Sequence, residues 1–444
     1  MRSCQQTDGI GNEEDGFRPL QILTGSDCMN AAGIDVSSRK STVAVLRPFG
    51  EVVRLPFDVA NDTVGLASLV EQLKALDGET RVVLEHTGRY YEPVAKALHE
   101  AGLYVSAVNP LLIKEYGANS LRRVKTDKAD AVKIARYALD NWADLRDYTP
   151  MDTIRYDLKT LNRQFQLASK QRTASANNLI ALLEQSFPGI RKCFDSPVRS
   201  DGTQKWVDFS HTFWHVDCVR KQSLNAFAER YRKWCKRHGY IFKQSNAEEV
   251  YSLAKNAVVL VPKSEVTKIL VQEAASQLTS ISRSVETYRA EMERLASTLP
   301  EYPAVMEMYG VGKSFGPQLM AEIGDVRRFE RKQSLVAFAG IDPMPNQSGD
   351  KNVRSNKSSK RGSPYLRKTL FNIMGIYLKC SPQDEPVYQF LDRKRSEGKP
   401  FYVYMTAASN KFLRRYYAKV RDYLATLEDL PPVDMDSTGL QTHN

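Results

Sequence analysis

The order of strand-like and helix-like segments between residues 31 and 139 constrains the fold of this chain most strongly. Residues 31–46 predict two strands joined by a polar turn, and residues 52–57 predict a third strand. The segments that follow predict a helix over 64–76, a strand over 81–85, a helix over 91–101, a strand over 104–108, and two further helices, a short one from Pro110 and one over 127–139. Three strands followed by alternating helices and strands predict a mixed sheet with helices on its faces.

The length of 444 residues exceeds what one hydrophobic core holds, so we expect several domains. No apolar run is long enough for a membrane span, and residues 1–27 lack the apolar core of a secretory signal. We therefore expect a cytoplasmic protein with no membrane partner. The predicted divisions are a disordered tail over 1–29, an α/β domain over 30–145, a helical region over 146–300 with an inserted subdomain over 186–265, a mainly helical domain over 301–426, and a tail over 427–444.

The excess of basic side chains indicates which partners the chain can bind and does not indicate its fold. The net charge is +11 and the isoelectric point is about 9.2. Nucleic acid is the commonest partner of such a chain, although a basic protein without that partner explains the charge equally well.

Two long helical segments frame the middle of the chain. Residues 151–185 carry apolar side chains at steps of three and four, and residues 271–299 repeat this pattern over four heptads. The second pattern predicts an inter-chain or hairpin coiled coil, which we expect to pair protomers; a bundle helix packed within one chain is the alternative. Residues 186–265 between them are predicted to be irregular and rich in aromatic side chains.

Six cysteines are present without any CxxC pair, which fits reduced thiols. The spacing of His211, His215 and Cys218 can bind zinc, but a fourth ligand is not evident. Because Trp206, Phe209, Phe213 and Trp214 surround these residues, we favour a packed aromatic segment.

Acidic residues stand at four notable positions in the predicted α/β domain. Asp35 lies within the first strand, Glu85 ends the strand over 81–85, and Asp127 and Asp130 share one face of a helix. A carboxylate in an apolar strand is costly to bury unless it is paired or binds a metal. Four such groups can hold two Mg²⁺ ions, or Mn²⁺ in their place, for phosphoryl transfer. By themselves, Asp127 and Asp130 are also explained as charges that complement a helix dipole.

Ser348 stands before a glycine in a polar, basic segment over 346–364. A serine among cations can attack a DNA phosphate, since the cations neutralise the phosphate. Serine needs activation, and Asp350 is the acidic side chain close by in the segment. From the residues alone we favour a phosphate-binding loop with a capping serine. The cations predicted to contact nucleic acid are Lys351, Arg354, Lys357, Lys360, Arg361 and Arg367.

Residues 308–325 predict a helix-hairpin-helix, in which Gly310, Gly312 and Lys313 bring backbone N–H groups and a cation close to phosphate. An ordinary packing unit is the alternative. Residues 230–237 interleave cations with aromatic side chains, which suits phosphate contact and base stacking, or else a solvated basic helix.

Several separated segments resemble the IS110-type transposases. They are GIDVSSRKSTVAVL, LEHTGRYYEPVAKAL, VNPLLIKEYG and KTDKADAVKIA in the first half, and FAGIDPMPNQSGDKN and SKRGSPYLRKTL in the second. The resemblance covers residues 31–145 and 300–430. It implies a RuvC-like, RNase H-fold domain with a DEDD set of metal ligands at Asp35, Glu85, Asp127 and Asp130. It also implies a C-terminal transposase domain in which Ser348 is the nucleophile and forms a covalent link to DNA.

The resemblance implies partners as well. DNA of the element ends and of the target is the substrate, and a structured bridge RNA pairs with both. The metal domain and the serine domain of different protomers build one site, so a homo-dimer or homo-tetramer is expected, in the nucleoid of a bacterial or archaeal cell. The insertion over 186–265 departs from compact members of the family.

The leading prediction is therefore a DNA recombinase that moves an insertion element. A second hypothesis is a RuvC-like nuclease that hydrolyses branched DNA without the serine. A third is a non-enzymatic nucleic-acid-binding assembly protein, against which the four intact acids argue.

Overall fold

The computed structural model describes residues 28–86, 88–116, 126–343 and 358–428, together with the backbone of 347–348 and 351–352. The chain divides into two compact units, residues 1–150 and 151–444. The predicted tails lie almost wholly outside the described residues, and the other predicted domain limits stay predictions. No helix in the described part is both long and apolar enough to span a bilayer.

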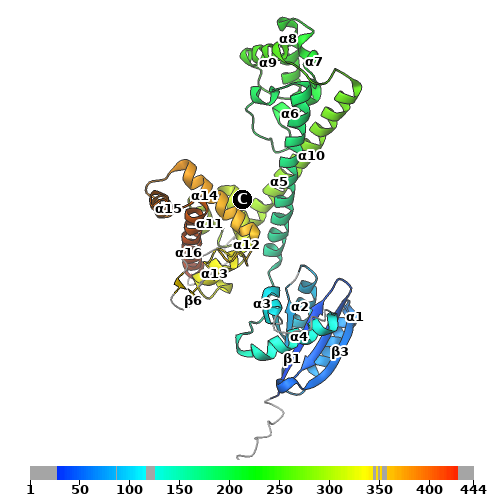
Figure 1. Cartoon of the computed structure of the whole chain (residues 1–444), viewed down its shortest axis with the longest axis vertical. Helices are drawn as coiled ribbons and strands as arrows, with labels where there is room; N and C mark the ends of the chain where they lie inside the picture. Colours follow the sequence, from blue (N-terminus) through cyan, green and yellow to red (C-terminus); the bar gives the residue numbers. More distant parts are fainter. Residues whose placement is uncertain are drawn as a thin grey trace, which may run out of the picture. The chain divides into compact units, whose positions relative to one another are not determined.

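Five strands form the sheet of the first unit, in the order β3-β2-β1-β4-β5 (Figure 1). Strands β1 to β3 form an antiparallel meander, in which Gly33 of β1 pairs with Ala44 of β2. Strands β4 and β5 join on the other side of β1 as parallel neighbours, with Gly33 opposite Val83. The strands are β1 Met29–Val36, β2 Lys40–Leu46, β3 Val52–Ala60, β4 Glu79–Glu85 and β5 Tyr104–Val108.

Helices cover both faces of this sheet. Ile34 belongs to a core cluster that includes Leu69 and Val94, so α1 and α2 pack on one face. Ala31 belongs to a second cluster with Ile134, so α4 packs on the opposite face, where α3 joins it. The bounds are α1 Thr63–Lys74, α2 Tyr91–Glu100, α3 Pro110–Tyr116 and α4 Asp127–Asp140, with short 3-10 helices η2 Pro48–Gly50 and η3 Trp142–Asp144.

Three antiparallel strands followed by two parallel ones, with helices on both faces, make an RNase H-like domain. The rest of the described chain is mainly helical. The predicted fold class is confirmed: a mixed-sheet RNase H-like domain precedes a helical region.

Two long helices, α5 (Thr153–Ser186) and α10 (Glu265–Ala296), pack along each other in the second unit (Figure 1). The heptad positions of α10 face the chain's own helices: Val271, Leu278, Val285 and Met292 are all buried. Helices α5, α6 and α12 supply the contacts. The seam therefore forms a hairpin within one chain. Ile281, Tyr288 and Leu295 of the same pattern are only half-buried, so the pairing of protomers through α10 stays a prediction.

The segment between α5 and α10 folds as a small helical body rather than the predicted irregular one. Its helices are η4 Ile190–Cys193, α6 Lys205–Thr212, α7 Asp217–Arg220, α8 Leu224–Arg237 and α9 Gln244–Asn256. Its core is aromatic: the ring centroids of Phe209 and Phe213 lie 4.6 Å apart, and Trp234 meets Phe209 edge-on at 5.9 Å. Helices α6 and α7 have only 8 and 4 residues, so no long apolar period marks this part of the sequence.

His215 belongs to this core and is only 1% exposed. Its Nδ1 accepts a hydrogen bond from the backbone N–H of Asp217 at 3.0 Å, and its Nε2 lies 3.1 Å from the carbonyl oxygen of Val261. Both ring nitrogens are thus satisfied by backbone groups. The favoured interpretation, a packed aromatic segment rather than a zinc site, agrees with this geometry.

The remaining helices pack around α16. Helices α11, α13, α14 and α15 all contact α16, whose Phe412 and Tyr416 are fully buried. Their bounds are α11 Tyr302–Met306, α12 Gly312–Ile323, α13 Lys332–Ala339, α14 Pro364–Cys380, α15 Pro386–Ser396 and α16 Phe401–Glu428, with the 3-10 helix η5 Val326–Arg328 after α12.

Buried polar contacts join α5 to these helices. Glu322 of α12 is 2% exposed and accepts hydrogen bonds from Asn162 Nδ2 at 2.7 Å and Ser363 Oγ at 2.8 Å. Nearer the start of α5, Arg155 Nη2 donates to both carboxylate oxygens of Glu301, at 2.6 and 2.8 Å. Since buried polar groups are stable only when they are paired, these contacts fix the register of α5 against the C-terminal helices.

Loss of the Glu301 charge is expected to destabilise this unit. Glu301→Gln leaves the buried Arg155 guanidinium with the half-exposed Asp152 as its one direct ionic contact among the described residues, and breaking a buried pair costs about 3–5 kcal/mol. Urea unfolding followed by circular dichroism measures the change. Glu291→Gln is the matched control, because it removes a surface pair with Arg294 on α10 and should leave the unfolding midpoint almost unchanged. Equal midpoints for the two variants would contradict the assignment.

Candidate carboxylate site and serine segment

Asp35 lies near the end of β1, on the face of the sheet that α4 covers. Successive side chains of a strand alternate between its faces. Ala31 packs in the core cluster of the α4 face, and a Cβ added to Gly33 would lie 2.3 Å from the carbonyl oxygen of Ala131 in α4. Asp35 is the next residue of this series, so its half-buried carboxylate projects on the α4 side.

Glu85 occupies the matching position on the neighbouring strand. The register of β1 and β4 pairs Ile34 with Leu84, so Asp35 and Glu85 follow this pair on adjacent parallel strands. Val83 packs in the core of the α4 face, and Glu85 is two residues further on. Its half-buried carboxylate therefore projects on the same side as that of Asp35.

Asp127 and Asp130 belong to the first turn of α4. Thr126 caps the helix, since its Oγ1 accepts a hydrogen bond from the backbone N–H of Ala129 at 3.2 Å. The buried, sheet-facing side chains of α4 include Ala131 and Ile134. Asp127 stands four residues before Ala131, and Asp130 stands four residues before Ile134. Both acids therefore lie on the sheet-facing side of α4, one turn before its buried side chains.

The four predicted acids thus come from three elements to one end of one face of the sheet. Their donor atoms are all carboxylate oxygens, the ligand type that Mg²⁺ prefers. Within the part of the chain that the structure describes, however, no three acidic, histidine or cysteine side chains are close enough together to hold a metal. Asp35 and Glu85 both interact with other groups. Their role as metal ligands stays a prediction.

Asp58 of β3 is a fifth carboxylate at this end of the sheet, and the sequence did not single it out. It accepts hydrogen bonds from Lys40 Nζ and Thr42 Oγ1, both at 2.7 Å. The hydrogen bond from Lys40, with that from Thr42, lowers the pKa of Asp58. The Asp58 hydrogen bond and charge, together with the Asp127 charge, raise the pKa of Lys40. Asp58 is therefore held by a cation and a hydroxyl group of the neighbouring strand β2.

The segment that carries Ser348 is anchored at both ends. Pro343 and Ser358 form an isolated bridge, and Ser359 Oγ donates to Asp342 Oδ1 at 2.5 Å. Within the segment, β6 (Gln347–Ser348) pairs antiparallel with β7 (Lys351–Asn352) through the backbone. The side chain of Ser348 and those of Lys351, Arg354 and Lys357 lie outside the described residues, as does Asp350, so the predicted nucleophile stays a prediction.

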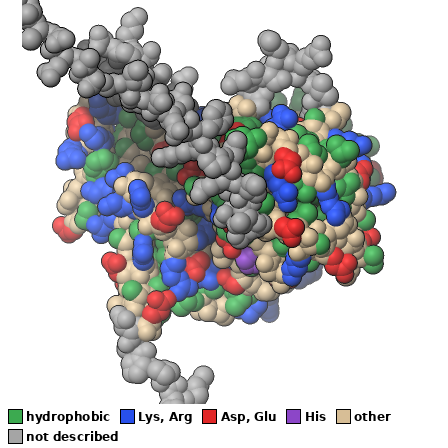
Figure 2. All heavy atoms as spheres, turned by 90° about the horizontal axis from the view of Figure 1, so that it is seen from below, with side chains coloured by type: hydrophobic (Ala, Val, Ile, Leu, Met, Phe, Trp, Pro, Cys, Tyr) green, Lys and Arg blue, Asp and Glu red, His purple; other side chains and the backbone are tan. Residues whose placement is uncertain are grey.

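The other predicted nucleic-acid contacts fall on described surfaces. Gly310, in the turn between α11 and α12, has a φ of +75°, and Gly312, the first residue of α12, has a φ of +51°. The Lys313 side chain that follows is 82% exposed. Lys360 and Arg361 are exposed, and Arg367 is half-buried. Figure 2 shows Lys and Arg side chains over much of the visible face, interspersed with Asp and Glu. The geometry suits contact with phosphates, and nucleic-acid binding by these residues stays a prediction.

Helix α8 corrects one part of that prediction. Its cations Arg232, Lys233 and Lys236 are exposed, whereas Tyr231 and Trp234 are 0% and 4% exposed. The aromatic rings of this helix are core side chains and cannot stack on bases.

Two family models match the chain. A model of DEDD-type IS110 transposases matches residues 32–188, and a model of the IS116/IS110/IS902 transposase family matches residues 302–389. Together the matched segments span more than half of the chain and include all four acids and Ser348.

Individual proteins are similar over most of their length. The pilin gene-inverting protein of Moraxella lacunata is 24% identical over 77% of this chain and 80% of its own. A 44.8 kDa protein of insertion element IS116 from Streptomyces clavuligerus is 22% identical over 82% and 88%. A shorter match is the transposase of insertion sequence element IS1111A from Coxiella burnetii, which is 30% identical over 27% and 32%.

Among solved structures, Thermus thermophilus RuvC in complex with a Holliday junction substrate matches with a TM-score of 0.21 and 18% identity, covering 26% of this chain and 96% of its own. The two family models cover the two halves of one kind of protein in the order expected from the sequence motifs. The chain belongs to the IS110 family of transposases.

Proposed function

We propose that this protein is a DNA recombinase that cuts and rejoins DNA to move an insertion element. The observation that carries the proposal is the placement of Asp35, Glu85, Asp127 and Asp130 at one end of one face of an RNase H-like sheet. The similar proteins support it, since one is named as a gene-inverting protein and another as the transposase of an insertion sequence.

The four carboxylates would hold Mg²⁺, with Mn²⁺ as a substitute. Carboxylates that gather at one point repel one another, so a divalent cation is what would draw the set together. When bound, Mg²⁺ would neutralise charge on the phosphate during phosphoryl transfer. The position of Asp127 and Asp130 in the first turn of α4 adds the positive end of the helix dipole beside the acids.

Ser348 would supply the nucleophile. Its Oγ forms a bond to the DNA phosphorus while the bond from phosphorus to the leaving nucleoside oxygen breaks, and the serine proton ends on that oxygen. A hydroxyl of a second strand then attacks the phosphoserine, which restores the serine hydroxyl and reseals the DNA. The covalent intermediate keeps the energy of the phosphodiester bond, so rejoining requires no further energy source.

Target choice would come from a structured RNA that pairs with donor and target DNA, and the active form would be a dimer or tetramer. The net charge of +11 supports a nucleic-acid partner of this kind. Because Val271, Leu278, Val285 and Met292 of α10 are already buried within one chain, protomers would meet through its half-buried side chains or through other surfaces.

Covalent trapping tests the proposed chemistry. The protein, with RNA from its own locus, is mixed with labelled element-end DNA and Mg²⁺, then denatured and separated on a gel. We expect a protein–DNA adduct that Ser348→Ala abolishes and that Ser363→Ala retains, since the Ser363 side chain caps α14 and binds Glu322. Reactions without RNA should give no adduct.

Two results would overturn the proposal. Cleaved DNA without any adduct in the wild-type protein would favour a RuvC-like hydrolytic nuclease. Binding without cleavage by the wild-type protein would favour a non-enzymatic assembly protein.

A further inference from the structure

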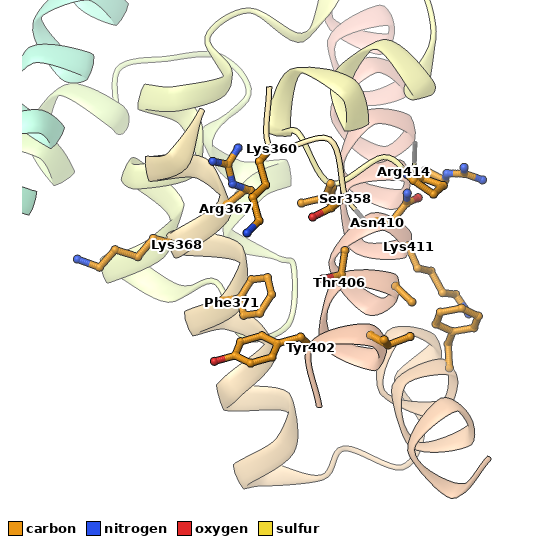
Figure 3. A pocket seen from close by; sticks show the side chains of 15 residues that line it. Ser358, Lys360, Arg367, Lys368, Phe371, Tyr402, Thr406, Asn410, Lys411 and Arg414 are labelled. Atoms are coloured by element: carbon orange, nitrogen blue, oxygen red, sulfur yellow. The ribbon is translucent and has the colours of Figure 1, made fainter. Parts of the chain in front are cut away.

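A pocket of about 1180 Å³ opens between α14 and α16 (Figure 3). Pro343 and Ser358, the residues on either side of the segment that carries Ser348, line it. Helix α16 contributes side chains four residues apart, Tyr402, Thr406, Asn410 and Arg414, which form one stripe along the helix. Neither the carboxylates nor the helix-hairpin-helix uses this pocket.

The polar part of the lining is strongly basic. The cations that line it are Lys360, Arg367, Lys368, Lys411 and Arg414, and none of the described lining residues is acidic. The ammonium group of Lys368 is turned away and donates to Gln166 Oε1 at 2.7 Å (Figure 3). In a pocket, charges of one sign raise the local concentration of a ligand of the opposite sign. An anionic ligand is therefore favoured.

Arg367 is the most constrained of these cations. Its Nη1 donates to the carbonyl oxygens of Ala339 at 3.0 Å and Gly362 at 2.8 Å, which holds the guanidinium in place. Among the described residues it has no carboxylate partner, and burial lowers its pKa. A half-buried guanidinium that is fixed by neutral groups is well suited to bind a phosphate, because the phosphate supplies the missing negative charge.

The other end of the pocket is aromatic. Phe371 and Tyr402 lie together there, away from Lys360 and Arg367 (Figure 3). Their ring centroids are 6.3 Å apart with an interplanar angle of 39°, which is the range of direct ring contact. No base fits between them, so they form one wall. Tyr402 is 73% exposed and thus leaves an aromatic surface open to a ligand.

We propose that this pocket binds one unpaired nucleotide of a nucleic-acid strand, with a backbone phosphate at Lys360 and Arg367 and the base on the wall of Phe371 and Tyr402. Asn410 can both donate and accept a hydrogen bond at a base edge. The bases of a duplex are stacked inside it and cannot reach such a wall. The inference rests on the proposed function in one respect: the strand held here would be the one presented to the Ser348 segment.

Strand binding can be measured without chemistry. The full chain carrying Ser348→Ala is titrated into labelled single-stranded DNA of about 12 nucleotides, RNA of the same sequence, the matching DNA duplex, and adenosine monophosphate. We expect Tyr402→Ala to weaken single-strand binding roughly tenfold, as the loss of one stacked base does, and to leave duplex binding unchanged. Tyr402→Phe should retain binding. Phe49→Ala is the control, since Phe49 is fully exposed outside the pocket.

Photo-crosslinking locates the base. Strands with iodinated bases should form adducts that mass spectrometry assigns to Tyr402 or Phe371, and the class that crosslinks, DNA or RNA, identifies the strand. The proposal is overturned if Tyr402→Ala binds single strands like the parent, if it loses duplex and single-strand affinity in the same ratio, or if only the free mononucleotide binds. Because no cleavage is measured, failure here is independent of failure in the trapping assay.

Discussion

Asp35→Asn should lower DNA cleavage about a thousandfold, because it would remove one charged ligand of the proposed Mg²⁺ site, worth several kcal/mol of transition-state stabilisation. The substitution keeps the size of the side chain and should leave the fold intact. Cleavage of labelled element-end DNA measures the rate, and calorimetric titration with Mg²⁺ alone should show weaker ion binding.

Asp58→Asn is the matched control for this experiment. Asp58 lies at the same end of the sheet but is engaged by Lys40 and Thr42, so the variant should cleave at close to the wild-type rate. An Asp35→Asn protein that still cleaves normally would show that Asp35 is not a required metal ligand. An Asp58→Asn protein that is equally impaired would show that general electrostatics rather than metal ligation matters here.

Gly33→Ala should lower cleavage about a hundredfold without touching a carboxylate. The added Cβ would lie 2.3 Å from both the Ala131 carbonyl oxygen and the Ala135 nitrogen, so α4 must move away from β1. Asp127 and Asp130 move with it, and a displacement of about 1 Å costs about that factor. Overpacking should also lower the free energy of unfolding by about 1–3 kcal/mol.

Gly375→Ala controls for the added methyl group. Gly375 lies in α14. Apart from the nearby backbone of the helix and the two chain neighbours, no atom would lie within 4 Å of a Cβ added there. We therefore expect unchanged cleavage and slightly higher stability, since Ala favours helix over Gly. Thermal unfolding and the cleavage assay are run together on both variants. Wild-type cleavage by Gly33→Ala would mean that the position of α4 does not control the acids.

The strands and the place of Asp35 in the first of them were predictable because local pattern and tertiary position agree there. Strand β1 is buried on both faces, so the residues from Ala31 to Ile34 are all small or apolar. Asp35, which follows them, is therefore conspicuous in the sequence. The pairing of β1 with β4 could not be read from the sequence, yet it is what places Glu85 beside Asp35.

Other parts depend on long-range packing that leaves little trace in the sequence. The heptads of α10 are the same whether the partner is α5 or another chain, so the pattern alone does not choose. The cations beside Tyr231 and Trp234 in the sequence suggested that the two rings are available for stacking. The cations lie on the exposed face of α8, however, and the two rings lie on its buried face. The signal for the pocket in the sequence is the four-residue spacing of Tyr402, Thr406, Asn410 and Arg414.

The hairpin of α5 and α10 sets a fixed length inside the protein. The C-terminal core holds α5 at Leu158 and Phe165, and the inserted body holds it at Leu179 and Leu183. The middle of one contact lies about 20 residues from the middle of the other, or about 30 Å along a helix. One turn of double-stranded DNA is about 34 Å. A duplex that ran along the helix pair and touched both bodies would meet them on the same side, one turn apart.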